Sequence, residues 1–155
     1  MGARPDEQRL DAWRALLSAQ RALLDRLADD LRREQGLQLS SYEVLLHLSQ
    51  APGRRLRMHE LADSVLLTPS GLTRLVDRLE LEGLVSRQAC PTDRRGAFVA
   101  MTPAGRARLR RAAPTHLRGI QEHFGRHLTD AEAETLSRAL SRVAQGGSPK
   151  GPAAR

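Results

Sequence analysis

Residues 69–82 combine short hydroxyl side chains, a glycine and arginines at a spacing that places them on one side of a helix. Hydroxyl and guanidinium groups can hydrogen-bond to phosphate oxygens and to the edges of nucleic-acid bases, and a small residue allows close approach to both. An ordinary surface helix of mixed charge would have a similar composition, so this face alone does not decide the function. The candidate contact residues on it are Ser70, Gly71, Thr73, Arg74, Asp77 and Arg78.

A second charged group follows in a turn-like segment between two strand-like runs, 84–88 and 97–101, which together predict a β-hairpin. Arg94 and Arg95 at its tip suit the narrow minor groove of DNA, which concentrates negative potential. Asp93 would hold an arginine in a fixed orientation through a charge-assisted pair. A solvated turn is the alternative interpretation. The candidate contacts of the hairpin are Arg87, Asp93, Arg94 and Arg95.

Two helices, 58–65 and 69–82, must position these residues, and a short turn separates them. Thr68 can cap the second helix, and Pro69 suits its first position because a missing N–H costs nothing there. In a helix-turn-helix the two helices cross around such a turn, and the second lies in the major groove of DNA. With the hairpin that follows, the sequence predicts a winged helix-turn-helix over 58–102. Its inner faces and turn are apolar and comprise Leu61, Ala62, Val65, Leu67, Leu72, Leu75, Val76 and Leu79.

Amphipathic helices are predicted before this unit. The first, 6–34, has leucines and one tryptophan at three- and four-residue steps, and its apolar stripe is wide enough to serve a second subunit as well. A shorter helix, 40–50, follows with Ser40 or Ser41 as its cap.

Two further helices are predicted after the unit. A Thr102-Pro103 pair starts a long helix, in which Pro114 should cause a bend or a break. A capping box then starts the last helix, whose apolar face ends near 143. The Gly- and Pro-rich segment 146–155 is expected to be a disordered tail.

Positive charge is concentrated in the middle of the chain, which carries a formal net charge of +7 at pH 7. Residues 54–111 hold twelve arginines and six acidic residues. Residues 1–53 hold seven basic and eight acidic residues, and 112–155 hold six and four. A randomly solvated surface would not predict this distribution. The excess around the predicted helix-turn-helix favours a polyanionic partner.

These residues resemble the MarR family of winged-helix regulators, and the likeness extends from the first helix to about Val143. The resemblance implies a mainly α fold with a small β-wing. It implies one domain, 1–145, with dimerisation helices at 6–34 and 103–145 and a winged helix-turn-helix lobe at 40–102. The motifs that carry it are Glu60-Leu61-Ala62, Thr73-Arg74-Leu75-Val76-Asp77-Arg78-Leu79-Glu80, Gly83-Leu84-Val85, Asp93-Arg94-Arg95 and Met101-Thr102-Pro103-Ala104-Gly105.

The resemblance also implies partners. Family members are obligate homodimers that bind a pseudo-palindromic double-stranded DNA operator, and most are repressors released by small, often aromatic or anionic, ligands. Such ligands bind between the dimerisation helices and the DNA-binding lobe. The candidate ligand-binding residues in the corresponding segments are Trp13, Leu17, Tyr42, Leu46, His116 and Leu117, and packing in the dimer core is an equally good interpretation for the tryptophan.

Redox and metal sensing are alternatives within the same fold. The peroxide-sensing branch of the family has its cysteine in the first helix, whereas the only cysteine here, Cys90, falls in the wing near Arg87. His116, His123 and His127 would share a face of a continuous helix, but no cysteine and no clearly placed carboxylate completes a metal site. An incidental thiol and solvated or interface histidines are therefore the preferred interpretations, and no metal site is assigned.

Other classes of function have little support. The sequence has no Gly-rich phosphate loop, no G-x-S-x-G and no H-E-x-x-H, so we expect neither catalysis nor a cofactor. No apolar run of about eighteen residues predicts a membrane span, and the charged N-terminus predicts a cytoplasmic protein. A winged-helix module that binds RNA or protein remains the alternative to a DNA-binding regulator.

Overall fold

The computed structural model describes residues 7–65, 67–90 and 93–146, without the side chains of 90 and 93–96. The predicted tail therefore lies almost wholly outside the described residues. In chain order the elements are α1 (Glu7–Gln35), α2 (Leu39–Gln50), the 3-10 turn η1 (Pro52–Arg54), β1 (Arg55–Arg57), α3 (Met58–Val65), α4 (Pro69–Leu81), β2 (Val85–Cys90), β3 (Asp93–Met101), α5 (Pro103–His123), the 3-10 turn η2 (Gly125–His127) and α6 (Asp130–Gly146).

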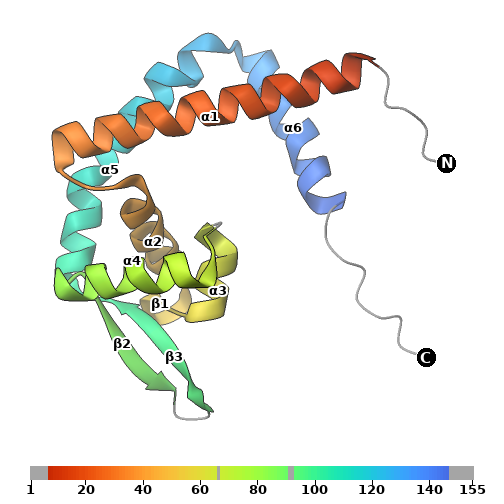
Figure 1. Ribbon diagram of the computed structural model, residues 1–155. Helices are drawn as coiled ribbons and strands as arrows, with labels where there is room; N and C mark the ends of the chain where they lie inside the picture. Colours follow the sequence, from red (N-terminus) through yellow and green to blue (C-terminus); the bar gives the residue numbers. More distant parts are fainter. Residues whose placement is uncertain (1–6, 66, 91–92, 147–155) are drawn as a thin grey trace, which may run out of the picture.

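The elements form a lobe and an arm (Figure 1). In the lobe, α2, α3 and α4 lie together and the β2–β3 hairpin extends away from them. In the arm, α1 and the distal part of α5 run alongside each other, and α6 follows at the far side. The lobe and arm share α5, which begins beside the hairpin and ends against α1. The mainly α fold with a small β-wing is thereby confirmed.

The wing is an antiparallel three-stranded sheet with the order β1-β3-β2. Leu56 pairs with Val99 in β3, which in turn pairs with Arg87 in β2. The strands β2 and β3 extend further toward the tip than the sequence predicted, and the register shifts between Ala89 and Cys90. Short β1 fixes the base of the hairpin to the start of α3, so the wing projects from a supported root.

A threonine caps the first turn of both α4 and α5. The hydroxyl of Thr68 accepts a hydrogen bond from the backbone N–H of Gly71 at 3.2 Å, with Pro69 at the first helical position of α4. The Thr102 hydroxyl likewise accepts from the N–H of Gly105 at 3.0 Å and donates to the carbonyl oxygen of Gly83 at 2.7 Å. Both predicted helix starts are confirmed.

A close backbone approach joins α5 to the start of the wing. A Cβ atom placed on Gly105 would lie 2.1 Å from the carbonyl oxygen of Leu84, a backbone atom that cannot move aside easily. The same carbonyl accepts a hydrogen bond from the N–H of Thr102 at 3.1 Å. Glycine at this position therefore sets the contact between the first turn of α5 and the strand that follows α4.

The helix-turn-helix has the predicted core. Side chains of α3 and α4 enter one buried cluster with residues from α2, the wing and α5. Leu61, Leu72 and Leu79 are at most 1% exposed. The predicted inner-face residues Val65, Leu75 and Val76 are also buried, and Ala62 and Leu67 pack against the cluster.

The expected cap of the second helix is wrong, and of the two outcomes expected at Pro114 the break is excluded. The second helix begins at Leu39 after Gln38, which makes no side-chain cap, and the expected cap Ser41 lies buried inside the helix. Packing of α2 into the core therefore outweighs the preference of serine for a helix start. Pro114 does not break α5, which continues from Pro103 to His123. A proline removes one helical hydrogen bond, and neighbouring Ala112 and Thr115 are buried against other elements, which holds the helix together.

Candidate nucleic-acid interface

One side of α4 is exposed beside the wing. Ser70, Thr73, Arg74, Asp77 and Arg78 are all exposed, as the helical spacing predicted, and Gly71 is half-buried beneath the Thr68 cap. The Thr73 hydroxyl donates a hydrogen bond to the carbonyl oxygen of Pro69 at 2.9 Å. Because a hydroxyl keeps its acceptor lone pairs and can rotate, this bond does not prevent contact with a base edge or a phosphate.

Arg78 reaches away from its helix. Its Nη2 donates to Oε1 of Gln38, the residue before α2, at 2.7 Å. This bond links α4 to the start of α2, and no local signal in the sequence identified Gln38. Arg74 and Arg78 thus differ, since Arg78 has a fixed partner in the lobe.

Arg87 in β2 is held by two carboxylates of α4. Its Nη2 lies 2.5 Å from Oδ1 of Asp77, and its Nη1 lies 2.6 Å from Oε2 of Glu80. The backbone N–H of Arg87 also donates to Oε1 of Glu80 at 2.9 Å. We call Asp77, Glu80 and Arg87 the wing clamp, because they join α4 to β2, the strand that starts the wing hairpin.

The wing clamp shifts the ionisation of its members. The backbone N–H of Arg87, and then its guanidinium, hold the pKa of the Glu80 carboxyl below its usual range. Glu80 therefore stays ionised at neutral pH. Residues 77 and 80 are three apart on one helix, which places both acids on one side, but no local signal in the sequence identified Glu80 as a partner of Arg87.

Two arginines of β1 lie against an aromatic ring of the wing. The guanidinium carbon of Arg55 is 4.9 Å from the centroid of Phe98, and that of Arg57 is 5.4 Å from it. The N–H of Arg57 donates to Oε2 of Glu60 at the start of α3. These contacts add positive charge at the root of the wing, which the sequence analysis counted only in the total.

The predicted tip contacts lie outside the described side chains. The backbone of Asp93 pairs with that of Cys90, and Arg94 and Arg95 belong to β3, so the hairpin itself is confirmed. The orientations of the side chains of Asp93, Arg94 and Arg95 are not described. The side chain of Cys90 is not described either, so the suggested redox role of its thiol stays untested.

Of the six candidate ligand-binding residues, Tyr42 and His116 form a ring–ring contact. The ring centroids of Tyr42 in α2 and His116 in α5 are 4.4 Å apart. The Nδ1 atom of His116 is buried and has no hydrogen-bond partner among the described residues. Burial lowers the pKa of His116 and raises that of Tyr42, so both rings are neutral at pH 7.

The other candidates lie elsewhere. Leu46 is half-buried and packs against the core of the lobe. Trp13 and Leu17 are exposed on the N-terminal half of α1, which extends away from the lobe (Figure 1), and Leu117 is 63% exposed on α5. A single chain therefore does not enclose these residues in one pocket with Tyr42.

The three histidines do not converge. His123 ends α5 with Nε2 2.7 Å from Oδ2 of Asp30 in α1, so a carboxylate does lie beside it, contrary to expectation. His127 belongs to the separate turn η2, and His116 faces Tyr42. The described part of the chain contains no group of three or more His, Cys, Asp or Glu side chains arranged to hold a metal ion.

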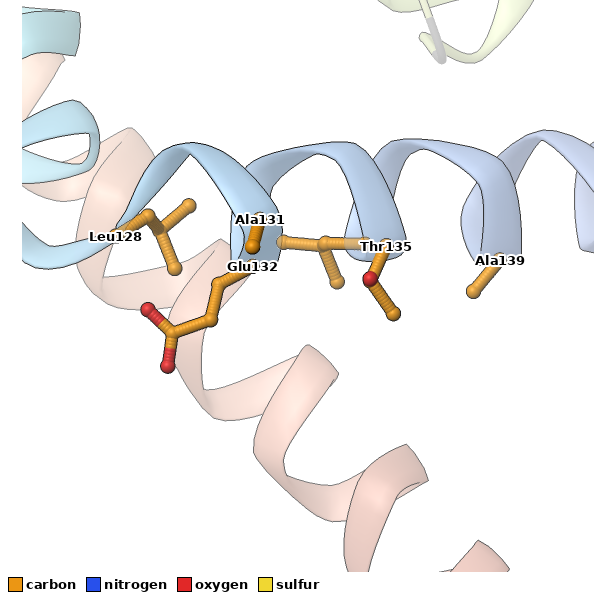
Figure 2. A pocket seen from close by; sticks show the side chains of 6 residues that line it. Leu128, Ala131, Glu132, Thr135 and Ala139 are labelled. Atoms are coloured by element: carbon orange, nitrogen blue, oxygen red, sulfur yellow. The ribbon is translucent and has the colours of Figure 1, made fainter.

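An apolar surface runs along the arm. The groove between α1 and α5 is lined by Gln20, Leu23, Leu24, Leu27, Ile120 and Phe124. On α6, which has no buried residue, apolar and small side chains lie along one side, and Figure 2 shows Ala131, Thr135 and Ala139 among them, with Leu128 just before the helix. We call these two surfaces the arm face. Val143 is 70% exposed nearby.

The helix-turn-helix core, the exposed side of α4 and the adjoining hairpin define a winged helix-turn-helix protein. Residues 35–96 match the sequence profile of the MarR family. The regulator MhqR of Bacillus subtilis is 30% identical over 140 residues, which are 88% of this chain and 92% of that protein.

Solved structures agree with this match. Sco3205 of Streptomyces coelicolor, solved in complex with DNA, is 35% identical with a TM-score of 0.84, and the match covers 100% of this chain and 97% of that one. AbsC from the same organism is 33% identical with a TM-score of 0.82, covering 94% and 97%. The chain belongs to the MarR family of transcriptional regulators, whose members typically act on DNA as dimers and are released by ligands.

No helix within the described ranges is long and apolar enough to span a bilayer.

Proposed function

We propose that two copies of this chain bind a pseudo-palindromic operator, with α4 of each copy in a major groove and each wing at the adjacent minor groove. The observation that carries the proposal is the exposed side of α4 next to the wing, within the segment that holds most of the excess positive charge. Two recognition helices of a dimer then contact successive major grooves, about 34 Å apart. The likeness to Sco3205, which was solved with DNA, supports this arrangement.

The proposal divides the contacts by role. Ser70, Gly71, Thr73 and Arg74 lie in the first half of α4, where a recognition helix reads base edges. Arg94 and Arg95, at the wing tip, bind the minor groove and the backbone. Arg78 contacts phosphate beside its bond to Gln38. Because the roles differ, substitutions in the two regions should have different signatures.

The regulator acts as a repressor in the cytoplasm, without a catalytic step, and a small aromatic or anionic ligand releases it from DNA. Tyr42 and His116 supply part of the ligand site, since they form a ring pair between the lobe and α5. Trp13 and Leu17 lie away from this pair in a single chain, so they are left out of the proposed ligand site. These assignments extend the typical behaviour of the family to this chain.

The test measures binding to three labelled nucleic acids across a range of salt concentrations. They are a duplex from the promoter region of its own gene, a random duplex of equal length, and an RNA duplex. Arg95→Ala should weaken binding to both DNA duplexes and lower the salt slope by about one. Thr73→Ala and Arg74→Ala should reduce the ratio of specific to random affinity, by roughly 5- to 100-fold for Arg74.

Equal affinity of these variants and the wild type for promoter DNA would overturn the assignment of the contacts. Preference for the RNA duplex would support the alternative of an RNA-binding module. An affinity for the promoter duplex that does not change with salt concentration would argue against an electrostatic DNA interface.

A further inference from the structure

The wing clamp engages both terminal nitrogens of one guanidinium inside the lobe. Both terminal nitrogens of Arg87 are bonded to carboxylates of α4, and its backbone N–H is bonded as well. The side chain of Arg87 is 31% exposed, whereas those of Asp77 and Glu80 are 53% and 38% exposed. The two acids therefore form the outer part of the clamp.

This geometry argues against direct DNA contact by Arg87 and Asp77. Two carboxylates surround one guanidinium, so the clamp carries a net formal charge of −1, which does not attract phosphate. If a phosphate took Arg87, the carboxylates of α4 would lose their partner next to the DNA.

We infer that Arg87 is a positioning residue, held by Asp77 and Glu80, which fixes the wing relative to the recognition helix. The inference rests on the proposed function, because it concerns how that interface reaches two grooves at once. The three bonds join α4 directly to β2, and β2 continues to the wing tip. With the wing clamp closed, the base-reading residues and the wing arginines keep one spacing, so less free energy is spent on ordering the wing when DNA binds.

In the key test, removing an acidic residue near DNA is expected to change the affinity in the direction opposite to the usual one. Removing an acid from a DNA-binding surface normally strengthens binding, because repulsion of the phosphates decreases. If the clamp positions the wing, Asp77→Asn and Glu80→Gln should instead weaken binding to promoter DNA, by roughly three- to tenfold. Glu82→Gln, the same change at an exposed residue just after α4, is the matched control and should leave affinity equal or slightly higher.

Arg87 itself is tested by two substitutions. Arg87→Ala should lower affinity for promoter DNA by about tenfold and leave the salt slope unchanged, since no phosphate contact is lost. Arg87→Lys should restore only part of the affinity, because an ammonium cannot bond both carboxylates in a fixed fork. The double variant Asp77→Asn with Arg87→Ala should bind no worse than Arg87→Ala alone, because both changes open the same clamp.

A readout without DNA separates positioning from loss of folding. Hydrogen exchange at the N–H of Arg87 should speed up in Glu80→Gln, while the amides of Leu79 and Val99 in the core keep their protection. If core protection is lost as well, the clamp holds the fold and the positioning role is wrong. A salt slope reduced by about one in Arg87→Ala, or tighter binding by Asp77→Asn, would equally overturn the inference.

These outcomes are distinct from failure of the proposed function. That function fails if the wild-type protein shows no salt-dependent binding to duplex DNA. The positioning role fails when the wild type binds but the clamp variants behave like the Glu82→Gln control.

Discussion

The Nε2 atom of His123, at the end of α5, lies 2.7 Å from Oδ2 of Asp30 in α1. Their side chains are only 21% and 14% exposed, so this pair joins the two long helices of the arm at a half-buried site. Nearby, Arg118 pairs with Glu34, and Gln35 donates to the Thr115 hydroxyl at 2.9 Å. Polar contacts therefore accompany the apolar packing of α1 on α5.

Asp30→Asn should destabilise the protein by about 1 kcal/mol at pH 7. The hydrogen bond from His123 lowers the pKa of Asp30 from its ordinary value of 3.8. A lowered carboxyl pKa contributes stability above the ordinary value, and this contribution is lost as the pH falls through the lower, folded value. Urea unfolding at one protein concentration should show a difference between wild type and variant that is present at pH 7 and shrinks below about pH 4.

Asp29→Asn is the control for this prediction. Asp29 is the preceding residue and pairs only with Arg32 of its own helix among the contacts described, on the exposed side. Its removal should cost at most a few tenths of a kcal/mol. A loss for Asp29→Asn as large as that for Asp30→Asn would contradict the role of the pair.

The buried ring of His116 should make stability depend on pH. Its pKa is lowered from 6.5 by burial, so the unfolded chain takes up a proton at a higher pH than the folded chain. The neutral ring therefore makes its full contribution to the free energy of unfolding above about pH 7. This contribution is lost as the pH falls below 6.5. His116→Phe keeps a ring next to Tyr42 and should remove this part of the decrease, as measured by unfolding at pH 8 and pH 5.5.

If His116→Phe has the same dependence as the wild type, the neutral buried ring is not its source.

Gly105→Ala should be among the most damaging small substitutions, costing about 3 kcal/mol or more. The new methyl group would meet the carbonyl oxygen of Leu84 at 2.1 Å, and the first turn of α5 would have to move away from the wing. Gly146→Ala has nothing within 4 Å of the new atom and should change stability by at most about 0.5 kcal/mol. Thermal unfolding of both variants measures the difference, and equal melting temperatures would refute the packing argument.

The arm face should hold two copies together. Val143→Glu places a charge on α6 at a residue that is 70% exposed in one chain, and it should raise the dissociation constant of the dimer by about 100-fold or more. Leu81→Glu makes the same kind of change at a residue 90% exposed on α4 and should leave the dimer intact. Sedimentation or light scattering over a dilution series distinguishes the two, and a Val143→Glu variant that stays dimeric would exclude this part of α6 from the interface.

Local signals in the sequence predicted most of the fold. The two Thr-Pro starts, the apolar steps in α3 and α4 and the capping box of α6 act within a few residues, so they can be recognised in one sequence. The capping box is present, with the N–H of Thr129 donating to Glu132 at 2.9 Å. The exposed side of α4 followed for the same reason.

Contacts between distant segments were beyond such signals. Arg78 meets Gln38 forty positions away, and His123 meets Asp30 across ninety-three. The buried position of Ser41 depends on how α2 enters the core, and the separation of Trp13 from Tyr42 depends on the direction of α1. Only the assembled tertiary structure fixes these relations.

Because α5 continues past Pro114 without a break, one helix connects the arm to the lobe. With twenty-one residues, the helix is about 30 Å long, and one end touches the root of the wing while the other meets α1. Over this length, a tilt of about 10° at the arm corresponds to a displacement of about 5 Å at the lobe. In a dimer the displacements of the two lobes would add. A small change between the arms then alters the distance between the two α4 helices by a sizeable part of a turn of DNA.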